Sequence, residues 1–324
     1  MTRQGSSEDT LYLDLNENNY VDSPWRKYPE KQPARLAQRM ADLYRVQPDQ
    51  ILLGRGADEL IDCLVRTFCE PGKDSILQFT PTFSSYQISA ELSGARVLSL
   101  GLNSEFQIDV DQAVKIIQQE KPKLVFVCTP NNPTGTLITA PSIQTLKDAC
   151  GQESLLVVDE AYIEFANTES LAVTATQPGN MVVLRTLSKI YGLAGLRLGT
   201  LIGCREVIDQ VRKVLPPFPI PSPLEELALQ QMDSVNLAPM LEEIQTERQR
   251  LKQFFAEHPE VLQVLPSAAN FLLVRFKQPE KVIETLMLQN ISVRDRSRLP
   301  GLSGGVRITI GTPEQNSRLI EALT

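Results

Sequence analysis

Five short apolar runs recur between residues 75 and 203, and each is bounded by polar or turn-forming residues. They cover Ser75–Phe79, Lys123–Cys128, Leu155–Val158, Met181–Leu184 and Leu198–Gly203. Runs of this length without regular alternation of polar residues are typical of strands that are buried on both faces, as in a parallel sheet. The pattern therefore predicts a buried sheet of this kind at the centre of the protein.

Segments with helical periodicity separate several of these runs. One helix is predicted over Ala57–Glu70, where the apolar side chains share one face and Pro71 and Gly72 end the pattern. Further helices are predicted over Asp109–Gln119 and Ser142–Cys150. Strands that alternate with helices in this way indicate an α/β architecture, in which helices pack on a sheet.

The pattern changes at residues 216–223, where the sequence PPFPIPSP places five prolines in eight residues. Proline lacks an amide donor and has a fixed φ angle, so neither a helix nor a central strand is expected there. A long helical pattern follows over Leu237–Glu257. Beyond it we expect shorter strands and helices at Phe271–Phe276, Glu280–Gln289, Ile291–Val293, Val306–Ile310 and Pro313–Leu323.

These changes predict two domains joined by a hinge in the chain of 324 residues. We expect a large α/β domain over residues 31–215, a proline-rich hinge over residues 216–223 and a smaller α+β domain over residues 224–324. Residues 1–30 are expected to form an N-terminal arm and part of the smaller domain.

Composition and charge narrow the class of protein. The net charge of −7 argues against nucleic acid or an anionic membrane surface as a partner, because both need a basic surface. No apolar run approaches the length that spans a membrane, and the polar start MTRQGSSEDT has no apolar signal core. The five cysteines are scattered without a C-x-x-C spacing, which fits a reducing compartment. We therefore expect a cytoplasmic protein.

The single histidine, His258, limits the chemistry further. A site with several histidine ligands is impossible, and a Ser-His-Asp triad would have to use this one residue. We expect no metal centre.

Polar and aromatic side chains follow the ends of the predicted strands. Ligands of open α/β sheets bind outside the carboxyl ends of the strands, so these residues are expected to share one crevice. They supply amides, an acid, a phenol, an amine and an aromatic ring, from Asn131, Asn132, Asp159, Tyr162, Lys189 and Phe83.

This set of groups suits a flat, phosphorylated ring that contains nitrogen. A lysine can form a Schiff base with an aldehyde, and a carboxylate can hold a protonated pyridine nitrogen. Amide and phenol groups can bind a ring oxygen, and arginine, serine or a helix N-terminus can bind a phosphate. Pyridoxal 5'-phosphate meets all of these conditions. Each residue alone also has an ordinary explanation, such as a solvated lysine or a turn in TPNNPTG, so the hypothesis rests on their joint placement.

Several longer stretches resemble the fold-type I, pyridoxal-phosphate-dependent aminotransferases, and within them the histidinol-phosphate aminotransferases. The resemblance runs from LDLNEN at residues 13–18 to RITIGT at residues 307–312. Its most specific stretches are KYPE (27–30), GRGADE (54–59), TPTFSSY (80–86), CTPNNPTG (128–135), VVDEAYIEF (157–165), RTLSKIYGLAGLR (185–197) and VRDRSRLPGLSGGVRITIGT (293–312). It implies a large domain with a mostly parallel, seven-stranded sheet flanked by helices, and a smaller α+β domain.

The resemblance also implies a role for each matching residue. Lys189 is implied to bind the cofactor as a Schiff base and to move the substrate proton, and Asp159 to hold the pyridine nitrogen. The other implied cofactor contacts are Asn131 and Tyr162 at the ring hydroxyl, Phe83 on the ring face, and Ser188, Arg197, Ala57 and Asp58 at the phosphate, with the Asp58 contact made through its backbone N–H. The implied substrate contacts are Arg294, Arg307 and Asn16. Tyr28 is implied to reach the cofactor phosphate of the neighbouring subunit in a homodimer.

The activity implied by the resemblance is amino transfer between L-histidinol phosphate and 2-oxoglutarate, which gives imidazole acetol phosphate and L-glutamate in histidine biosynthesis. Two alternatives keep the fold and the cofactor: a threonine-phosphate decarboxylase, and an aminotransferase for another amino acid. An alternative from a different class is a non-catalytic ligand sensor with an aminotransferase-like fold.

Overall fold

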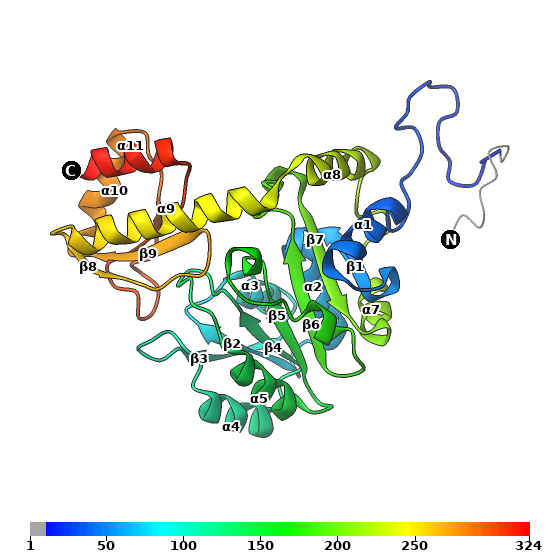
Figure 1. The fold of residues 1–324 in the computed structure, drawn as a ribbon. Helices are drawn as coiled ribbons and strands as arrows, with labels where there is room; N and C mark the ends of the chain where they lie inside the picture. Colours follow the sequence, from blue (N-terminus) through cyan, green and yellow to red (C-terminus); the bar gives the residue numbers. More distant parts are fainter. Residues whose placement is uncertain (1–10) are drawn as a thin grey trace.

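The structure, a computed structural model, describes residues 11–324, and two sheets organise this part of the chain (Figure 1). The polar start MTRQGSSEDT, and with it the beginning of the predicted arm, lies outside the described residues. Among the described residues, no helix is both long and apolar enough to cross a membrane.

The larger sheet has seven strands. Their order is β1 (Ile51–Arg55), β7 (Leu198–Gly203), β6 (Met181–Thr186), β5 (Leu155–Asp159), β4 (Leu124–Cys128), β2 (Ser75–Thr80) and β3 (Arg96–Gly101). Neighbouring strands from β3 to β6 are parallel, whereas β7 is antiparallel to both β6 and β1. The prediction of a mostly parallel, seven-stranded sheet is confirmed.

Helices cover both faces of this sheet. One hydrophobic cluster joins the sheet to α1 (Ala34–Tyr44), α4 (Val110–Glu120), α5 (Ala140–Cys150) and α6 (Ala172–Ala175). The cluster on the other face contains α2 (Gly56–Phe68), α3 (Ser85–Leu92) and α7 (Arg205–Arg212). Successive side chains of a strand point to opposite faces, so Val125 packs with the first cluster and Phe126 with the second. Burial on both faces explains why these strands read as unbroken apolar runs.

Several helices begin at capping residues that the sequence supplies. The side chain of Asp109 accepts a hydrogen bond of 3.0 Å from the backbone N–H of Gln112 at the start of α4. Thr139 caps α5 in the same way through the N–H of Ser142. These contacts satisfy amide groups that have no partner inside the helix, which fixes where each helix starts.

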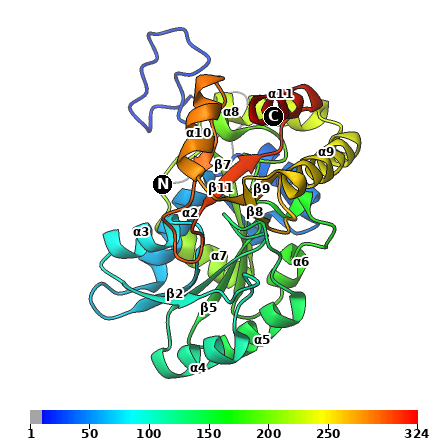
Figure 2. The ribbon, with the colours of Figure 1, turned by 90° about the vertical axis from the view of Figure 1, so that its left-hand side faces the viewer.

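The smaller sheet is antiparallel, with the order β10 (Arg294–Asp295), β11 (Gly305–Thr309), β9 (Phe271–Phe276) and β8 (Val261–Val264). The helices α9 (Leu237–Glu257), α10 (Pro279–Leu288) and α11 (Pro313–Leu323) pack with it around a separate core. Figures 1 and 2 show this sheet to one side of the larger sheet, with α9 running from one part of the protein to the other.

The proline-rich stretch leads into α8 (Ser222–Ser234), which packs on α1. The carboxylate of Glu225 accepts a hydrogen bond of 3.2 Å from the backbone of Leu36, and Arg39 lies 3.3 Å from Asp233. This helix therefore contacts the larger part of the molecule, and α9 is the helix that carries the chain across. The residue limits of the two domains stay a prediction.

Residues 11–33 contain no helix or strand and run away from both sheets in Figures 1 and 2. Apolar side chains in this segment are largely exposed, among them Leu11, Leu13, Tyr20 and Trp25. The ring of Tyr28 stacks on Phe218 with the ring centroids 5.1 Å apart. Apart from Gln32, which exchanges two hydrogen bonds with the backbone of Leu53 in β1, this segment thus has little contact with the core of its own chain.

Candidate active site

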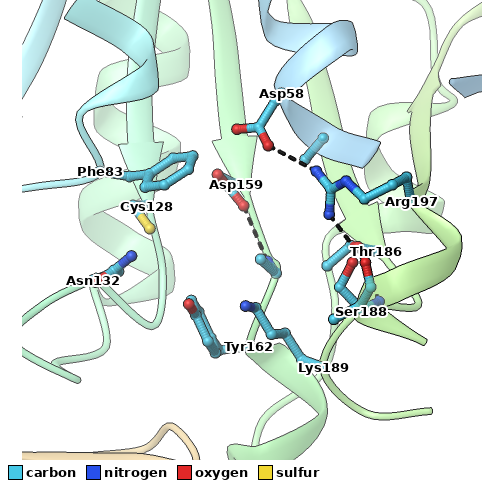
Figure 3. A pocket seen from close by; sticks show the side chains of 13 residues that line it. Asp58, Phe83, Cys128, Asn132, Asp159, Tyr162, Thr186, Ser188, Lys189 and Arg197 are labelled. Atoms are coloured by element: carbon cyan, nitrogen blue, oxygen red, sulfur yellow. Dashed lines mark hydrogen bonds and ion pairs between the residues drawn. The ribbon is translucent and has the colours of Figure 1, made fainter. Parts of the chain in front are cut away.

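A cavity of about 120 Å³ opens where three neighbouring parallel strands end (Figure 3). Cys128, Asp159 and Thr186 are the last residues of β4, β5 and β6, and all three line it. The remaining lining residues are Ala57, Asp58, Phe83, Asn132, Ala161, Tyr162, Ser188, Lys189, Ala194 and Arg197. Most of the predicted cofactor contacts therefore meet in one place, at the expected edge of the sheet.

Lys189 lies in the loop after β6, and the apolar residues near it in this loop, Leu187 and Ile190, are buried. The backbone turns at Gly192, whose φ of 67° favours glycine, and the N–H of Gly192 donates to the carbonyl of Lys189. The amine Nζ lies 5.5 Å from the centroid of the Tyr162 ring. Loss of hydration lowers the pKa of Lys189, and the positive charges of Arg307 and Arg197 lower it further. The amine is therefore neutral at a lower pH than an ordinary lysine.

Asp159 is only 3% exposed and is held by two hydrogen-bond donors. The hydroxyl of Tyr86 donates to Oδ2 at 2.6 Å, and the backbone N–H of Ala161 donates to Oδ1 at 3.0 Å. Burial raises the pKa of Asp159, and the two hydrogen bonds act in the opposite direction. A cation placed against this carboxylate would favour its charged form.

Tyr86 was not among the residues predicted from the sequence. Its ring is buried against Phe126, with centroids 4.6 Å apart, and meets Phe83 edge-on at 5.7 Å. This packing aims the hydroxyl at Asp159, which lies 73 positions away in the chain. Only the aromatic residues of TPTFSSY signal it in the sequence, and they do not indicate its partner.

The first turn of α2 lies directly against β7. A Cβ at Gly199 would come within 2.4 Å of the carbonyl carbon of Gly56 and 2.5 Å of the nitrogen of Ala57. Glycine at position 199 is what lets the two backbones approach this closely. The helix N-terminus, with its amide groups and the positive end of its dipole, is thereby placed beside Ser188 and Arg197.

Arg197 and Asp58 form an ion pair of 2.9 Å at this end of the cavity, as Figure 3 shows. Ser85 also donates to the Asp58 carboxylate, at 3.0 Å. The carboxylate is thus occupied by its own partners, which fits the expectation that Asp58 serves an anion through its backbone N–H. Arg197 keeps further donors for a second anion, because a guanidinium carries five N–H groups.

The two asparagines of TPNNPTG have different surroundings. Both polar atoms of the Asn131 amide are used within the protein, by Thr82, Thr134 and the carbonyl of Pro81, at 2.8 to 2.9 Å. Asn131 does not line the cavity, whereas Asn132 does. Asn131 thus braces the turn, and Asn132, rather than the predicted Asn131, is the amide that lines the cavity together with Tyr162 and Phe83.

The predicted substrate arginines come from the smaller sheet. Arg294 of β10 lies opposite Arg307 of β11, and Arg307 donates a hydrogen bond to Oδ1 of Asn132. The Arg307 guanidinium lies over the Phe271 ring, 5.3 Å from its centroid. Loss of hydration lowers the pKa of Arg307, and its charge in turn acts on Lys189 and Tyr162. The smaller sheet thus contributes a cationic wall beside the cavity.

Asn16 and Tyr28 are not brought to this cavity within one chain. Both lie in the exposed segment of residues 11–33, and neither is among the residues that line it. Their predicted roles stay predictions.

The residues around the cavity match the groups of pyridoxal phosphate. A buried carboxylate without a bonded cation, an aromatic ring and a lysine with a lowered pKa surround one end of the cavity. A helix N-terminus, a serine and an arginine surround the other. The first end suits a basic aromatic ring and the second suits a phosphate, so the residues fit this group.

Comparison with known proteins agrees with the geometry. Residues 14–323 match the model of the family described as aminotransferase class I and II. A histidinol-phosphate aminotransferase of Stenotrophomonas maltophilia is 39% identical over 333 residues, which cover 99% of this chain and 92% of that protein.

Solved structures share the fold. A histidinol-phosphate aminotransferase from Clostridium acetobutylicum superposes with a TM-score of 0.83 at 25% identity, covering 92% of this chain and 89% of that one. The enzyme of the same name from Sinorhizobium meliloti, solved in complex with pyridoxal-5'-phosphate, gives a TM-score of 0.84 at 23% identity, covering 95% and 88%.

These matches confirm the predicted resemblance, the fold class and the enzymatic nature of the protein. The match to an enzyme family argues against the alternative of a non-catalytic sensor. The match to the family model covers nearly the whole chain. The chain belongs to the aminotransferase class I and II family.

Proposed function

We propose that the protein transfers the amino group of L-histidinol phosphate to 2-oxoglutarate, which gives imidazole acetol phosphate and L-glutamate, a step of histidine biosynthesis. The observation that carries the proposal is the cationic wall of Arg294 and Arg307 beside Lys189. The curated relative that is 39% identical over nearly the whole chain supports the same activity.

Pyridoxal phosphate, when bound, supplies the electron sink that allows an amino group to be exchanged for an oxo group. Asp159 would hold its ring nitrogen, Phe83 its ring face, and Asn132 and Tyr162 its ring hydroxyl. Asn132 takes the place of Asn131 in this proposal because the Asn131 amide is already engaged. Its phosphate would lie against Ser188, Arg197 and the N–H groups of Ala57 and Asp58.

Lys189 has two tasks in the proposed reaction. It would anchor the cofactor covalently, and its Nζ, once released, would take the proton from the α-carbon of the amino donor and give a proton to the α-carbon of the amino acceptor in the other half-reaction. Both tasks require a neutral amine. The lowered pKa of Lys189, caused first by loss of hydration and then by Arg307 and Arg197, serves this requirement.

One site must accept a phosphate in one half-reaction and a carboxylate in the other. Guanidinium groups bind both anions through paired N–H donors, so Arg307 and Arg294 suit either substrate. Asn16 is proposed as a further substrate contact, from the resemblance of its segment alone.

We further propose a homodimer in which Tyr28 reaches the cofactor phosphate of the partner subunit. The support is the exposure of the apolar residues in the segment of residues 11–33, which a second copy would cover. We place the reaction in the cytoplasm, since all five cysteines are free and buried.

The test is to incubate the holoenzyme with L-histidinol phosphate and 2-oxoglutarate and to measure glutamate and imidazole acetol phosphate. The proposal expects both products in equal amounts. With threonine phosphate we expect no release of carbon dioxide, and with other amino donors much slower transfer. Release of carbon dioxide would identify a decarboxylase, and faster turnover of an aromatic or other amino acid would identify a different aminotransferase; either result would contradict the proposal.

A further inference from the structure

A third arginine lies on the same face of the β10–β11 pair as Arg294 and Arg307. Arg294 and Arg307 are direct partners in the antiparallel register, and the backbone N–H of Arg296 continues the pairing by donating to the carbonyl of Gly305 at 2.8 Å. Side chains two positions apart on a strand point to the same face. Arg296 therefore joins the other two, and Gly305, its neighbour on β11, has no side chain to cover it.

The three arginines of this group have no carboxylate bonded to them within residues 11–324. None of the three forms an ion pair with a carboxylate in this part of the chain. The Nε of Arg296 is buried without a hydrogen-bond partner. By contrast, the buried Arg185 is paired with both Glu160 and Glu164. Like charges on one face of a sheet are destabilising, and so is a buried donor without a partner, so this arrangement is typical of a site for an anion.

The arginine group also adjoins the cavity. Arg307 donates to Asn132, which lines it, and the charges of Arg307 and Arg296 both act to lower the pKa of Tyr162, which burial raises. The charges of Arg307 and Arg294 in turn lower the pKa of Arg296, after loss of hydration. All three guanidinium groups are thus near one another and near the place where a substrate meets Lys189.

We infer that Arg296 is a third guanidinium contact for the substrate phosphate, and that it makes the site prefer a doubly charged phosphate over a carboxylate. The inference rests on the proposed function and deepens it. A carboxylate has two oxygens and one charge, which a single guanidinium can satisfy. A phosphate monoester has three free oxygens and nearly two charges at neutral pH, so it can engage all three arginines.

The test compares Arg296→Gln with Arg298→Gln. Arg298 lies in the turn that follows and is exposed, so its variant loses the same charge outside the site. The two half-reactions of the holoenzyme are followed separately, with histidinol phosphate and with glutamate. In Arg296→Gln the KM for histidinol phosphate is expected to rise about tenfold or more, as for other hydrogen bonds to charged groups, while the KM for glutamate changes little. Arg298→Gln should leave both unchanged.

The pH dependence of histidinol phosphate binding distinguishes a phosphate contact from a merely structural role of Arg296. The second proton of a phosphate monoester leaves near pH 6, so the wild type should bind histidinol phosphate more tightly as the pH rises through that value. The rise should be smaller in Arg296→Gln and restored in Arg296→Lys, which keeps the charge. Equal losses for both substrates, or an unchanged pH dependence, would overturn the inference.

Competition by inorganic phosphate separates this inference from the proposed function. Inorganic phosphate is titrated into the holoenzyme while the visible absorbance of the cofactor is recorded. Weaker binding to Arg296→Gln than to Arg298→Gln is expected whatever the natural substrate is. If histidinol phosphate is not turned over but this difference is found, the proposed function fails and the phosphate site stands. If phosphate binds equally to both variants, the role of Arg296 is refuted.

Discussion

The hydroxyl of Tyr86 favours the charged form of the Asp159 carboxylate. Burial raises the pKa of Asp159, which works against the charged form that a pyridinium nitrogen needs. The 2.6 Å hydrogen bond from Tyr86 is the first of the contacts that act in the opposite direction. Tyr86 is therefore a positioning residue whose hydrogen bond also favours the charged form of its neighbour.

Replacing Tyr86 by phenylalanine should raise the pKa of Asp159 further, because a donor to the charged form is lost while the packing against Phe126 is kept. Asp159 is ionised only above its pKa, so cofactor binding weakens on acidification as the carboxylate takes up a proton. In Tyr86→Phe this weakening should begin at a higher pH. The measurement is the Kd of pyridoxal phosphate across the acidic pH range.

Tyr44→Phe is the matched control, since Tyr44 is also buried but belongs to the hydrophobic cluster on the other face of the sheet. It should leave the pH profile of cofactor binding unchanged. A Tyr86→Phe profile that coincides with the wild type would show that the hydroxyl does not tune Asp159.

At the scale of single residues, the sequence revealed the types of group better than their orientations. Lys189, Asp159 and Arg197 follow strand ends, and the cavity contains all three. The choice of Asn131 over Asn132 rested on the resemblance alone, because a turn has no periodicity that tells which side chain points inward. Tyr86 stayed hidden because its partner is distant in the chain and adjacent only in the folded sheet.

At the scale of elements, the junction of α2 and β7 forms the proposed phosphate end of the site. Gly199→Ala should force these elements apart, since its Cβ would meet backbone atoms of Gly56 and Ala57 that cannot rotate away. Overpacking of this kind costs about 1–3 kcal/mol. We expect the affinity for pyridoxal phosphate to fall about tenfold or more, as measured by titration of the cofactor-free protein.

Gly195→Ala provides the control for this substitution. A methyl group added at position 195 would have no atom within 4 Å, and the residue does not have a positive φ, so cofactor affinity should be unchanged there. Equal affinities of the two variants would show that the close approach of α2 and β7 does not matter for the phosphate.

The strand β6 also carries a buried ionic group on the face away from α2. Arg185 lies 3.3 Å from Glu160 and 2.6 Å from Glu164, and its guanidinium lies over the ring of Tyr44, 4.7 Å from the centroid. Glu160 follows Asp159 directly, so this group ties the end of β5 to its neighbouring strand. We expect it to hold the strand ends in place.

Arg185→Met should destabilise the protein by about 3–5 kcal/mol, because it leaves the buried Glu160 and the half-buried Glu164 without a cation. Arg212→Met removes an exposed pair with Asp209 instead and should cost less than about 1 kcal/mol. Midpoints of urea denaturation compare the two. Similar midpoints for both variants would contradict the structural role given to Arg185.

The sequence located most elements but not their directions. The apolar runs matched β2, β4, β5, β6 and β7, and α9 and α11 have the predicted limits. An apolar run looks the same in either direction, so it could not show that β7 is antiparallel. The strand β3 was not found because its side chains are mostly exposed or half-buried, and the short β10 lies just after the run predicted at Ile291–Val293.

At the scale of the whole molecule, most of the segment of residues 11–33 projects away from the rest of its own chain. It exposes large apolar side chains and carries Tyr28 and Asn16 away from the cavity. If this segment acts on a partner subunit, a complete site needs two copies. Such a site contains Lys189 of one chain and Tyr28 of the other.

Subunit mixing tests this arrangement. Tyr28→Ala and Lys189→Ala homodimers should each be impaired, for different reasons. When the two chains are combined, a mixed dimer has one site with both residues intact, so transaminase activity should exceed the average of the two parents. Mixing Lys189→Ala with a chain that carries both substitutions is the control. Activity equal to the average of the parents would contradict sharing of the site.

The central claim is that Lys189, in the loop after β6, is the covalent anchor of the cofactor. The most direct test is to reduce the holoenzyme with borohydride, digest it and locate the mass of the cofactor by mass spectrometry. The modification is expected on the peptide that contains Lys189, and Lys189→Ala should carry none. Modification of a different lysine, or of none in the wild type, would contradict it.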